Sequence, residues 1–461
     1  MSLFSRIILS SLCSLLVVGR AGRTHGQAVP APSLPVDVPA PIEPATRTLQ
    51  SWTEAKRLLR AHHPTLQQQQ AALTRADAQV TQAISRMLPH LDVGVGTDYS
   101  LVRPTFVAYD RPAEHQFFDE RSLVPNGNAA LTLTFSLAAL RSIASAERGV
   151  DAEKLTLAAT QHALVGTLAA TVLGVLGAER VAMRNQAGLA AAAERMRLTE
   201  RLVALGRATA LDAWRFAQDL GEARTRVVSA NEALSEAREA LGQALGLPEA
   251  VRLATSFDVS RLLTAQDAGC QRVARLADRA DMRAADARIE QAERATSAAE
   301  LAYLPEIRLG SQYVGTFAPT SAITYEGQRG LLHNWSATAN LVWSLLDGGA
   351  RAGGVRTAEA DLHAARSEQT ATQIAAHFEQ RKAERLVQVA RANLTIAEQN
   401  LTAARHVDAL SHKALELGHA SALEVIDAAR NLRAVEIAHA VSEVDLLAAT
   451  LRQQLVLAIC D

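Results

Sequence analysis

The second half of this 461-residue chain repeats the plan of the first half, and this repeat limits the available folds more than any other feature. Three patterns recur in the same order at an offset of about 210 residues, as in proteins built from a duplicated unit. They are Leu-Pro before an alternating segment (Leu88, Leu304), Leu-x-aromatic-Ser-Leu (133–137, 341–345) and an eight-residue turn segment beginning Leu-Gly (205–212, 417–424). We therefore predict two structural repeats, 49–250 and 273–461, joined by an equatorial linker at 251–272. Each repeat should contain a helix, two strands, a long helix, a turn with glycine and a second helix.

Four segments alternate between apolar and polar residues, which is typical of strands with one apolar and one polar face. These segments are Leu91–Leu101, Leu131–Leu137, Ile307–Tyr313 and Trp335–Leu345. A tilted strand needs about 9–11 residues to cross a membrane, and these segments approach that length. Trp335 and Trp343 share the apolar face about 26 Å apart at about 3.3 Å per residue, which suits two aromatic girdles on a lipid-facing wall. An ordinary half-buried sheet of a soluble protein has the same pattern, so this alternative stays open.

Two long segments without proline, Leu140–Leu205 and Arg351–Leu417, are predicted to be helices. Each would extend roughly 100 Å at about 1.5 Å per residue, which indicates an extended bundle instead of a compact domain. Aromatic residues make up only 4% of the chain, as expected for helices that pack through small side chains. Leu155–Ala178 carries no charge, but its Ala, Gly and Thr content and its continuation on both sides favour a helix buried between neighbours over a membrane span.

The N-terminus has the pattern of a secretory signal peptide, which we place at 1–28. Arg6 precedes an apolar segment, residues 7–18, that is too short to span a bilayer. In the triplet Gly26-Gln27-Ala28, small residues occupy both positions that a signal peptidase recognises. Six prolines between positions 30 and 44 then indicate an extended linker at 29–48.

The chain contains three cysteines, and the first, Cys13, would be removed with the signal peptide. The remaining two, Cys270 and Cys460, are too few for a disulfide framework and lack the spacing of metal ligands. A single disulfide between them requires that they meet in space, which the sequence leaves open.

The predicted strands cannot close a membrane barrel within one chain, because the smallest such barrels have about eight strands. Open sheet edges cannot face lipid, since their backbone groups would lack hydrogen-bond partners. Strands that span a membrane must therefore share a barrel with other copies of the chain. Three copies would supply twelve strands, enough to leave a lumen. The helices would then continue the cylinder as a helical tube on the aqueous side.

These motifs resemble the outer membrane efflux protein family, the TolC-like channels. The resemblance covers about residues 50–458. It rests on the duplicated Leu-Pro, on the two glycine turns and on the segment Trp343-Ser-Leu-Leu-Asp-Gly-Gly before a helix. Ala61-His62-His63-Pro64 also resembles a family motif, with His63 in place of the family's asparagine. It implies a homotrimer in the cell outer membrane, in contact with its lipid. The implied fold is mainly α with a small transmembrane β part, in which four strands per protomer share a twelve-stranded barrel and long helices form a periplasmic α-barrel. A periplasmic adaptor (membrane fusion) protein and an inner-membrane transporter are the implied partners.

The resemblance also assigns roles to residues of the two glycine turns. It implies that both turns are helix-hairpin tips that close the periplasmic entrance and meet the adaptor. The tip residues are Leu205, Gly206, Leu211, Leu417, Gly418 and Leu423. Glu424 and Asp427 match positions of acidic rings at the entrance constriction, where six carboxylates in a trimer would attract cations. Capping of helices explains the glycines, and a solvated helix face explains the acidic residues, without any such role.

One family feature is altered. The family prototype latches its entrance with an arginine two residues past the second tip glycine, bonded toward an aspartate in the other hairpin. Asp212 matches the aspartate, but Ala420 stands at the arginine position. Arg207 and His419 are the candidate substitutes.

The resemblance implies a passive trimeric exit duct of a tripartite efflux pump for small compounds. A channel for type I protein secretion is the alternative, and a secreted coiled-coil structural or interaction protein is a second one. Either channel differs from the coiled-coil protein in that the apolar face of its strands meets lipid, whereas in the coiled-coil protein this face is buried against helices. No constellation of catalytic residues, metal ligands or cofactor motifs emerges, so no enzyme activity is predicted. A net charge of −1 argues against nucleic-acid binding.

Overall fold

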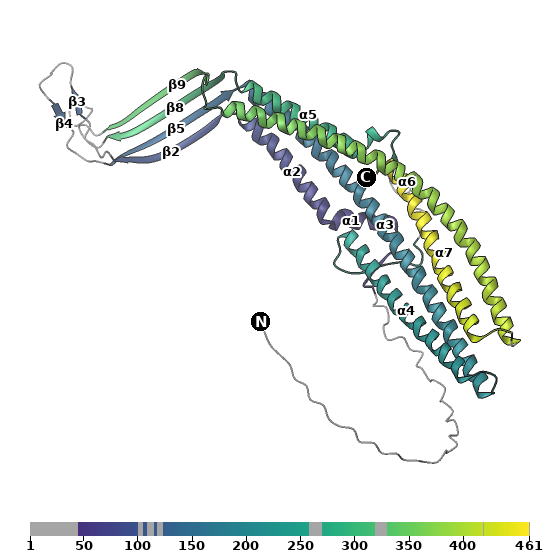
Figure 1. The fold of residues 1–461 in the computed structure, drawn as a ribbon. Helices are drawn as coiled ribbons and strands as arrows, with labels where there is room; N and C mark the ends of the chain where they lie inside the picture. Colours follow the sequence, from purple (N-terminus) through teal and green to yellow (C-terminus); the bar gives the residue numbers. More distant parts are fainter. Residues whose placement is uncertain are drawn as a thin grey trace, which may run out of the picture.

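The computed structural model describes residues 45–99, 105–107, 115–117, 123–257, 270–318, 330–417 and 419–460. It shows an elongated molecule with a β-sheet at one end and long helices running away from it (Figure 1). The predicted signal peptide and most of the predicted linker lie outside these residues. The linker's last residues correct its prediction, because Arg47 and Thr48 belong to β1 (Arg47–Leu49). This strand pairs in parallel with β6 (Val251–Leu253), which gives its backbone groups partners.

The four predicted strands form one antiparallel sheet in the order β2-β5-β8-β9. Their bounds are His90–Tyr99 (β2), Leu123–Phe135 (β5), Glu306–Ala318 (β8) and Gly330–Val342 (β9). The register puts the alternating pattern of all four strands in phase. One row across the sheet joins Val93, Ala129, Tyr313 and Trp335. The neighbouring row joins Asp92, Ala130, Gln312 and Ser336, so one face of the sheet is apolar and the other is largely polar.

Two strands end earlier than the alternation predicts, because local turn chemistry starts the next element. Ser136 is the N-cap of the following helix, and its hydroxyl accepts a hydrogen bond from Ala139 N at 3.0 Å. After Val342, Asp347 accepts hydrogen bonds from the backbone of Gly349 at 3.1 Å and of Arg351 at 3.0 Å. Trp343 and Leu345 therefore lie beyond β9, not within it. The predicted end of the first strand, Leu101, lies outside the described residues.

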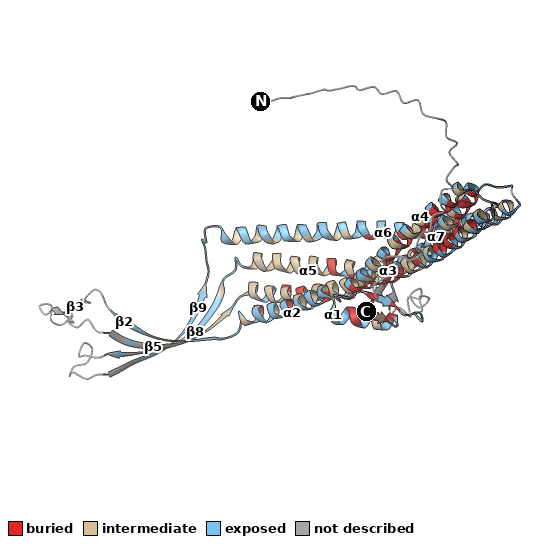
Figure 2. Cartoon of the chain, turned by 90° about the horizontal axis from the view of Figure 1, so that it is seen from below, coloured by how far each residue is buried: buried red, intermediate tan, exposed pale blue. Residues whose placement is uncertain are grey.

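The helices continue the sheet in the same lateral order as its strands. Helix α2 (Pro64–Ser85) precedes β2, α3 (Leu137–Ala204) follows β5, α5 (Ala280–Leu301) precedes β8, and α6 (Ala350–Glu416) follows β9. Neighbours in the series α2-α3-α5-α6 pack side by side (Figure 2). Helices α3 and α6 have 68 and 67 residues, which confirms the two long helices predicted from the absence of proline.

The two long helices each turn back into a second helix at the end far from the sheet. Helix α4 (Ala210–Leu245) packs on α3, and α7 (Ala422–Val456) packs on both α6 and α3. Each half of the chain thus contains a helix, two strands, a long helix, a turn and a second helix, in the predicted order. A short hairpin, β3 (Thr105–Val107) with β4 (His115–Phe117), lies between β2 and β5.

The main core lies midway along the molecule, where helix α1 (Trp52–His62) and β6 meet α3, α4 and α7. Among the described residues, α3 is the one helix long and apolar enough to cross a membrane by length and composition. Its uncharged part contributes Val165, Leu168, Val172 and Val175, all of which are buried in this core. One side of this uncharged part is therefore buried between neighbouring helices, while 33% of its apolar window is buried in all.

Two small features complete the middle of the molecule. His63 separates α1 from α2, and its Nδ1 accepts a hydrogen bond from Thr65 N at 3.3 Å, so it caps α2 as asparagine would. A 3-10 turn (Leu276–Asp278) precedes α5. Beside it, β7 (Cys270–Arg272) pairs antiparallel with β10 (Ala458–Cys460), which brings the backbone of Cys270 opposite that of Cys460.

Candidate functional sites at the hairpin tips and on the sheet

Both hairpin tips are closed by a backbone hydrogen bond at the same spacing. At the first tip, Gly206 adopts φ +68°, and Arg207 N donates to Leu202 O at 2.8 Å, as in a Schellman motif. At the second tip, His419 N donates to Ala414 O at the same distance, 2.8 Å. Gly418 itself lies outside the described residues.

Each tip leads into its second helix through a capping box. Thr209 and Asp212 exchange side-chain and backbone hydrogen bonds at the start of α4, and Ser421 and Glu424 do so at the start of α7. The Thr/Ser-x-x-Asp/Glu spacing could have predicted both boxes. Asp212 and Glu424 therefore have a structural role that does not depend on any ligand or partner.

The tips present apolar side chains to solvent. Leu205 and Leu417, which precede the two tip glycines, are 71% and 72% exposed. Leu211 and Leu423, at the start of the following helices, are also exposed. Because leucines of a helical core are normally buried, this duplicated apolar surface is a candidate contact for another protein.

The two acidic residues past the second tip lie on the exposed side of α7. Glu424 and Asp427 are exposed, whereas Val425 and Ile426 between them are buried. The Glu424 carboxylate accepts a hydrogen bond from Ser421 N at 2.7 Å. Both carboxylates are therefore exposed to solvent next to the second hairpin tip.

The structure does not bring the proposed latch residues together. The Asp212 carboxylate accepts hydrogen bonds from Thr209 and lies 3.6 Å from Arg215, one turn further along α4. Arg207 and His419 are both exposed, and neither forms an ion pair within the part of the chain that the structure describes.

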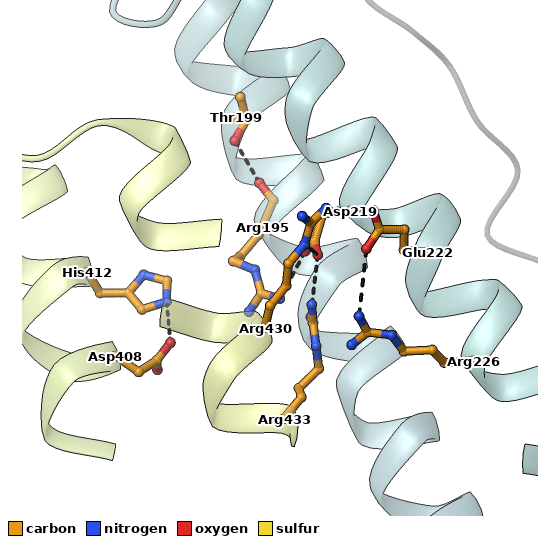
Figure 3. Close-up of polar contacts among 9 residues, drawn as sticks. All are labelled: Arg195, Thr199, Asp219, Glu222, Arg226, Asp408, His412, Arg430 and Arg433. Carbon is orange, nitrogen blue, oxygen red and sulfur yellow. Dashed lines mark hydrogen bonds and ion pairs between the residues drawn. The ribbon is translucent and has the colours of Figure 1, made fainter. Parts of the chain in front are cut away.

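A buried charged contact that joins the two hairpins lies further along the helices. Asp219 of α4 faces α3 and α7, and its side chain is only 1% exposed. Its carboxylate lies 3.4 Å from Arg195 Nη2, 3.2 Å from Arg430 Nε and 2.7 Å from Arg433 Nη2 (Figure 3). We call these four residues the Asp219 cluster. It links three helices, and α7 contributes two of its three arginines.

Glu222 extends this contact along α4. It accepts a hydrogen bond from Arg430 Nη2 at 3.0 Å and lies 3.7 Å from Arg226 (Figure 3). Arg430 therefore contacts two carboxylates one helical turn apart. Through this side chain α7 is held to α4 at both Asp219 and Glu222.

The Asp219 cluster keeps its carboxylate ionised. Burial alone would raise the pKa of Asp219, but the hydrogen bonds and charges of the surrounding arginines outweigh burial and hold this pKa below its ordinary value. Around the cluster, apolar residues of the same three helices are buried, among them Met196, Leu220 and Ile426. The charges are thus enclosed by packing, where removal of one partner has a large effect.

The apolar face of the sheet is exposed in the single chain. Val93 and Val95 are 72% and 90% exposed, and Trp335 is 76% exposed. Figure 2 shows that the helices run on from the end of the sheet and do not cover it. A sheet buried against helices, as the coiled-coil alternative requires, would have covered this face.

The two tryptophans differ in position. Trp335 lies within β9, and its indole N–H donates to Ser311 Oγ on the neighbouring strand at 2.8 Å. Trp343 lies just after β9, and its indole N–H donates to the Tyr303 carbonyl at 3.0 Å. Each therefore keeps an apolar ring at the surface with its polar atom satisfied, as aromatic residues at membrane interfaces do.

Solved structures of other proteins share this fold. VceC, an outer membrane protein of Vibrio cholerae, has a TM-score of 0.69 at 16% identity, with 88% of this chain and 95% of that chain covered. CusC has a TM-score of 0.70 at 16% identity, with 93% and 99% covered. The outer membrane channel CmeC of Campylobacter jejuni has a TM-score of 0.66 at 16% identity, with 87% and 86% covered. A comparison with functionally curated proteins gives no match.

The sequence matches the model of the family described as outer membrane efflux protein, over residues 56–247 and 273–458. These two segments contain both hairpins, the Asp219 cluster and the four strands of the sheet. The likeness to solved channels agrees with the TolC-like fold predicted from the repeat. The chain therefore belongs to the outer membrane efflux protein family.

Proposed function

We propose that this outer membrane protein is the trimeric exit duct of a tripartite efflux pump, which passively conducts small compounds to the outside. The observation that carries the proposal is a four-stranded sheet whose apolar face is exposed and whose edges, β2 and β9, each pair on one side only among the described residues. In lipid such edges must be paired, because no water is present to satisfy their backbone groups. Three copies, joined edge to edge, supply twelve strands and place the polar face of each sheet toward a lumen.

The helical part offers a matching surface for neighbouring copies. Several large apolar side chains of α6 are about half exposed or more: Ile374, Phe378, Val389, Ile396, Val407 and Leu410. They recur along most of the helix, so a long helix of another copy would cover them. This surface supports a periplasmic tube of packed helices below the barrel.

The entrance of the duct is assigned to the hairpin tips. The exposed leucines at both tips support docking of a periplasmic adaptor protein, and an inner-membrane transporter would supply the energy. Opening requires that α7 and α6 move relative to α3 and α4 or relative to the next copy. The Asp219 cluster supports the second route, because it fixes α7 to α3 and α4 within one chain.

Membrane fractionation followed by native mass measurement in detergent tests this proposal. A trimer that is extracted from the outer membrane only with detergent is the expected result. Its conductance in planar bilayers is then measured. A soluble monomer or dimer would refute both the shared barrel and the duct.

The first tip provides a prediction about docking. Gly206→Lys should abolish efflux while leaving trimer assembly intact, because it places a charge in the apolar tip surface. Gly206 has φ +68° and open space where a side chain would begin, so Gly206→Asn, which tolerates this conformation, is the matched control and should retain most transport. Efflux of a fluorescent substrate from cells checks both variants. Normal efflux by Gly206→Lys would show that this tip is not the docking surface.

The acidic residues provide a prediction about selectivity. The double variant Glu424→Gln, Asp427→Asn should lose cation selectivity and block by polyvalent cations, since it removes six carboxylates from a trimer. Glutamine retains an oxygen that can accept the hydrogen bond from Ser421 N, so the capping of α7 is largely preserved. Reversal potentials in a salt gradient measure the effect. Unchanged selectivity would contradict the acidic ring.

A further inference from the structure

Two of the chain's three cysteines lie in strands that pair with each other. Cys270 is the first residue of β7, and Cys460 is the last residue of β10. The antiparallel register places Cys460 opposite Cys270, Ile459 opposite Gln271, and Ala458 opposite Arg272. The third cysteine, Cys13, lies in the predicted signal peptide.

The hydrogen bonding of this ladder fixes the type of pair that the cysteines form. One position beyond these three pairs, Val273 N donates to Leu457 O at 2.9 Å, so these two residues form a hydrogen-bonded pair. Hydrogen-bonded and non-hydrogen-bonded pairs alternate along an antiparallel ladder. Counting three positions from Val273 places Cys270 and Cys460 in a non-hydrogen-bonded pair.

In a non-hydrogen-bonded pair the two Cα atoms lie about 4.5 Å apart, closer than in the alternate type. Disulfides join cysteines with Cα separations of about 4.4–6.8 Å, so the backbone spacing of this pair falls within the range of a disulfide. We propose that Cys270 and Cys460 form a disulfide that joins the C-terminal strand to the linker between the repeats. An outer membrane protein folds on the oxidising side of the inner membrane, where such bonds form and persist.

The bond would form by thiol–disulfide exchange with a protein disulfide as the oxidant. The thiolate of one cysteine attacks that disulfide and gives a mixed disulfide, and the thiolate of the second cysteine then displaces the oxidant. The two cysteines lose two protons and two electrons, and the oxidant leaves as a dithiol. The chain gains one S–S bond and loses its two S–H bonds.

The proposed disulfide would close a loop that contains the whole second repeat. Its helices, α5, α6 and α7, and its strands, β8 and β9, all lie between the two cysteines. The bond lies next to the end of α7 at Val456, opposite the hairpin tip at Ala422. It would therefore anchor the end of α7 that stays in place if the tip moves during opening.

Alkylation and peptide mapping of the full chain isolated from the outer membrane test this inference. The protein is denatured with an excess of iodoacetamide, either without reductant or after reduction, and then digested. Without reductant we expect the Cys270 and Cys460 peptides unalkylated and joined, from a band that migrates as a single chain on a non-reducing gel. After reduction both peptides should be alkylated.

The single variants Cys270→Ser and Cys460→Ser are matched controls. Each should leave its remaining cysteine alkylated without reductant, since the partner is absent. Alkylation of both cysteines in the unreduced wild-type chain would overturn the inference. A cross-link that makes the chain migrate as a dimer would overturn it equally, because the disulfide would then join two copies.

Discussion

Replacing Asp219 by alanine is expected to destabilise the helical part of the protein by about 3–5 kcal/mol, the cost of removing one partner from a buried ion pair. Arg195 and Arg433 have side chains that are only 14% and 11% exposed, so they cannot turn to water when the carboxylate is lost. A lower midpoint of heat denaturation, followed by far-ultraviolet circular dichroism in detergent, measures this effect. Glu222→Ala is the control and should have a much smaller effect, because Glu222 is 39% exposed.

The same substitution should open the entrance. Without Asp219, Arg430 and Arg433 of α7 lose their shared carboxylate partner on α4, and the second hairpin is held less firmly on the first. Single-channel conductance of Asp219→Ala should therefore exceed that of the wild type. The double variant Asp219→Ala, Arg433→Leu should recover part of the stability, since it leaves one fewer buried charge without a partner. Wild-type stability and conductance in Asp219→Ala would contradict the role of the cluster.

The pH dependence of this contribution follows from the lowered pKa of Asp219. A carboxyl whose pKa is lower in the folded state stabilises the protein above its unfolded pKa, which is about 3.9 for aspartate. Its contribution is lost as the pH falls through the lowered, folded pKa. The Asp219 cluster therefore holds the hairpins together across the neutral range and does not act as a switch there.

The sequence predicts the architecture well because the information is local and present twice. Absence of proline gives both long helices to within a few residues of their bounds, Leu137–Ala204 and Ala350–Glu416. Alternation gives the four strands and their apolar face. The strand ends were predicted less well, since a cap such as Ser136 or an acceptor such as Asp347 ends a strand even where the alternation continues.

The Asp219 cluster could not be predicted in this way. Asp219 and Arg433 are 214 residues apart in the chain, and nothing in the surrounding sequence distinguishes a buried aspartate from a solvated one. The family pattern drew attention to Asp212 instead, which the structure uses to cap α4. Only the packing of α7 against α3 and α4 shows which carboxylate meets the arginines. The role of a charged residue on a long helix thus depends on which neighbour covers it.

Placing an arginine on the apolar face of the sheet is expected to prevent assembly in the outer membrane. Val93 is 72% exposed and lies near the middle of β2, in the row that also contains Tyr313 and Trp335. On the lipid face an arginine costs up to about 2–4 kcal/mol, depending on its depth in the bilayer, and a trimer would carry three. We expect Val93→Arg to reduce the amount of trimer recovered from the outer membrane by a large factor.

Gln312→Arg is the matched control, because Gln312 lies in the adjacent row at almost the same depth but on the polar face. An arginine there would point into a water-filled lumen, so trimer yield should stay close to the wild type while conductance and ion selectivity change. Equal effects of the two variants would contradict a sheet with lipid on one side and water on the other. A soluble sheet with an exposed apolar face would respond in the opposite way, since a charge in place of Val93 would improve its solubility. The direction of the Val93→Arg effect therefore separates a membrane wall from a soluble surface, independently of any transport assay.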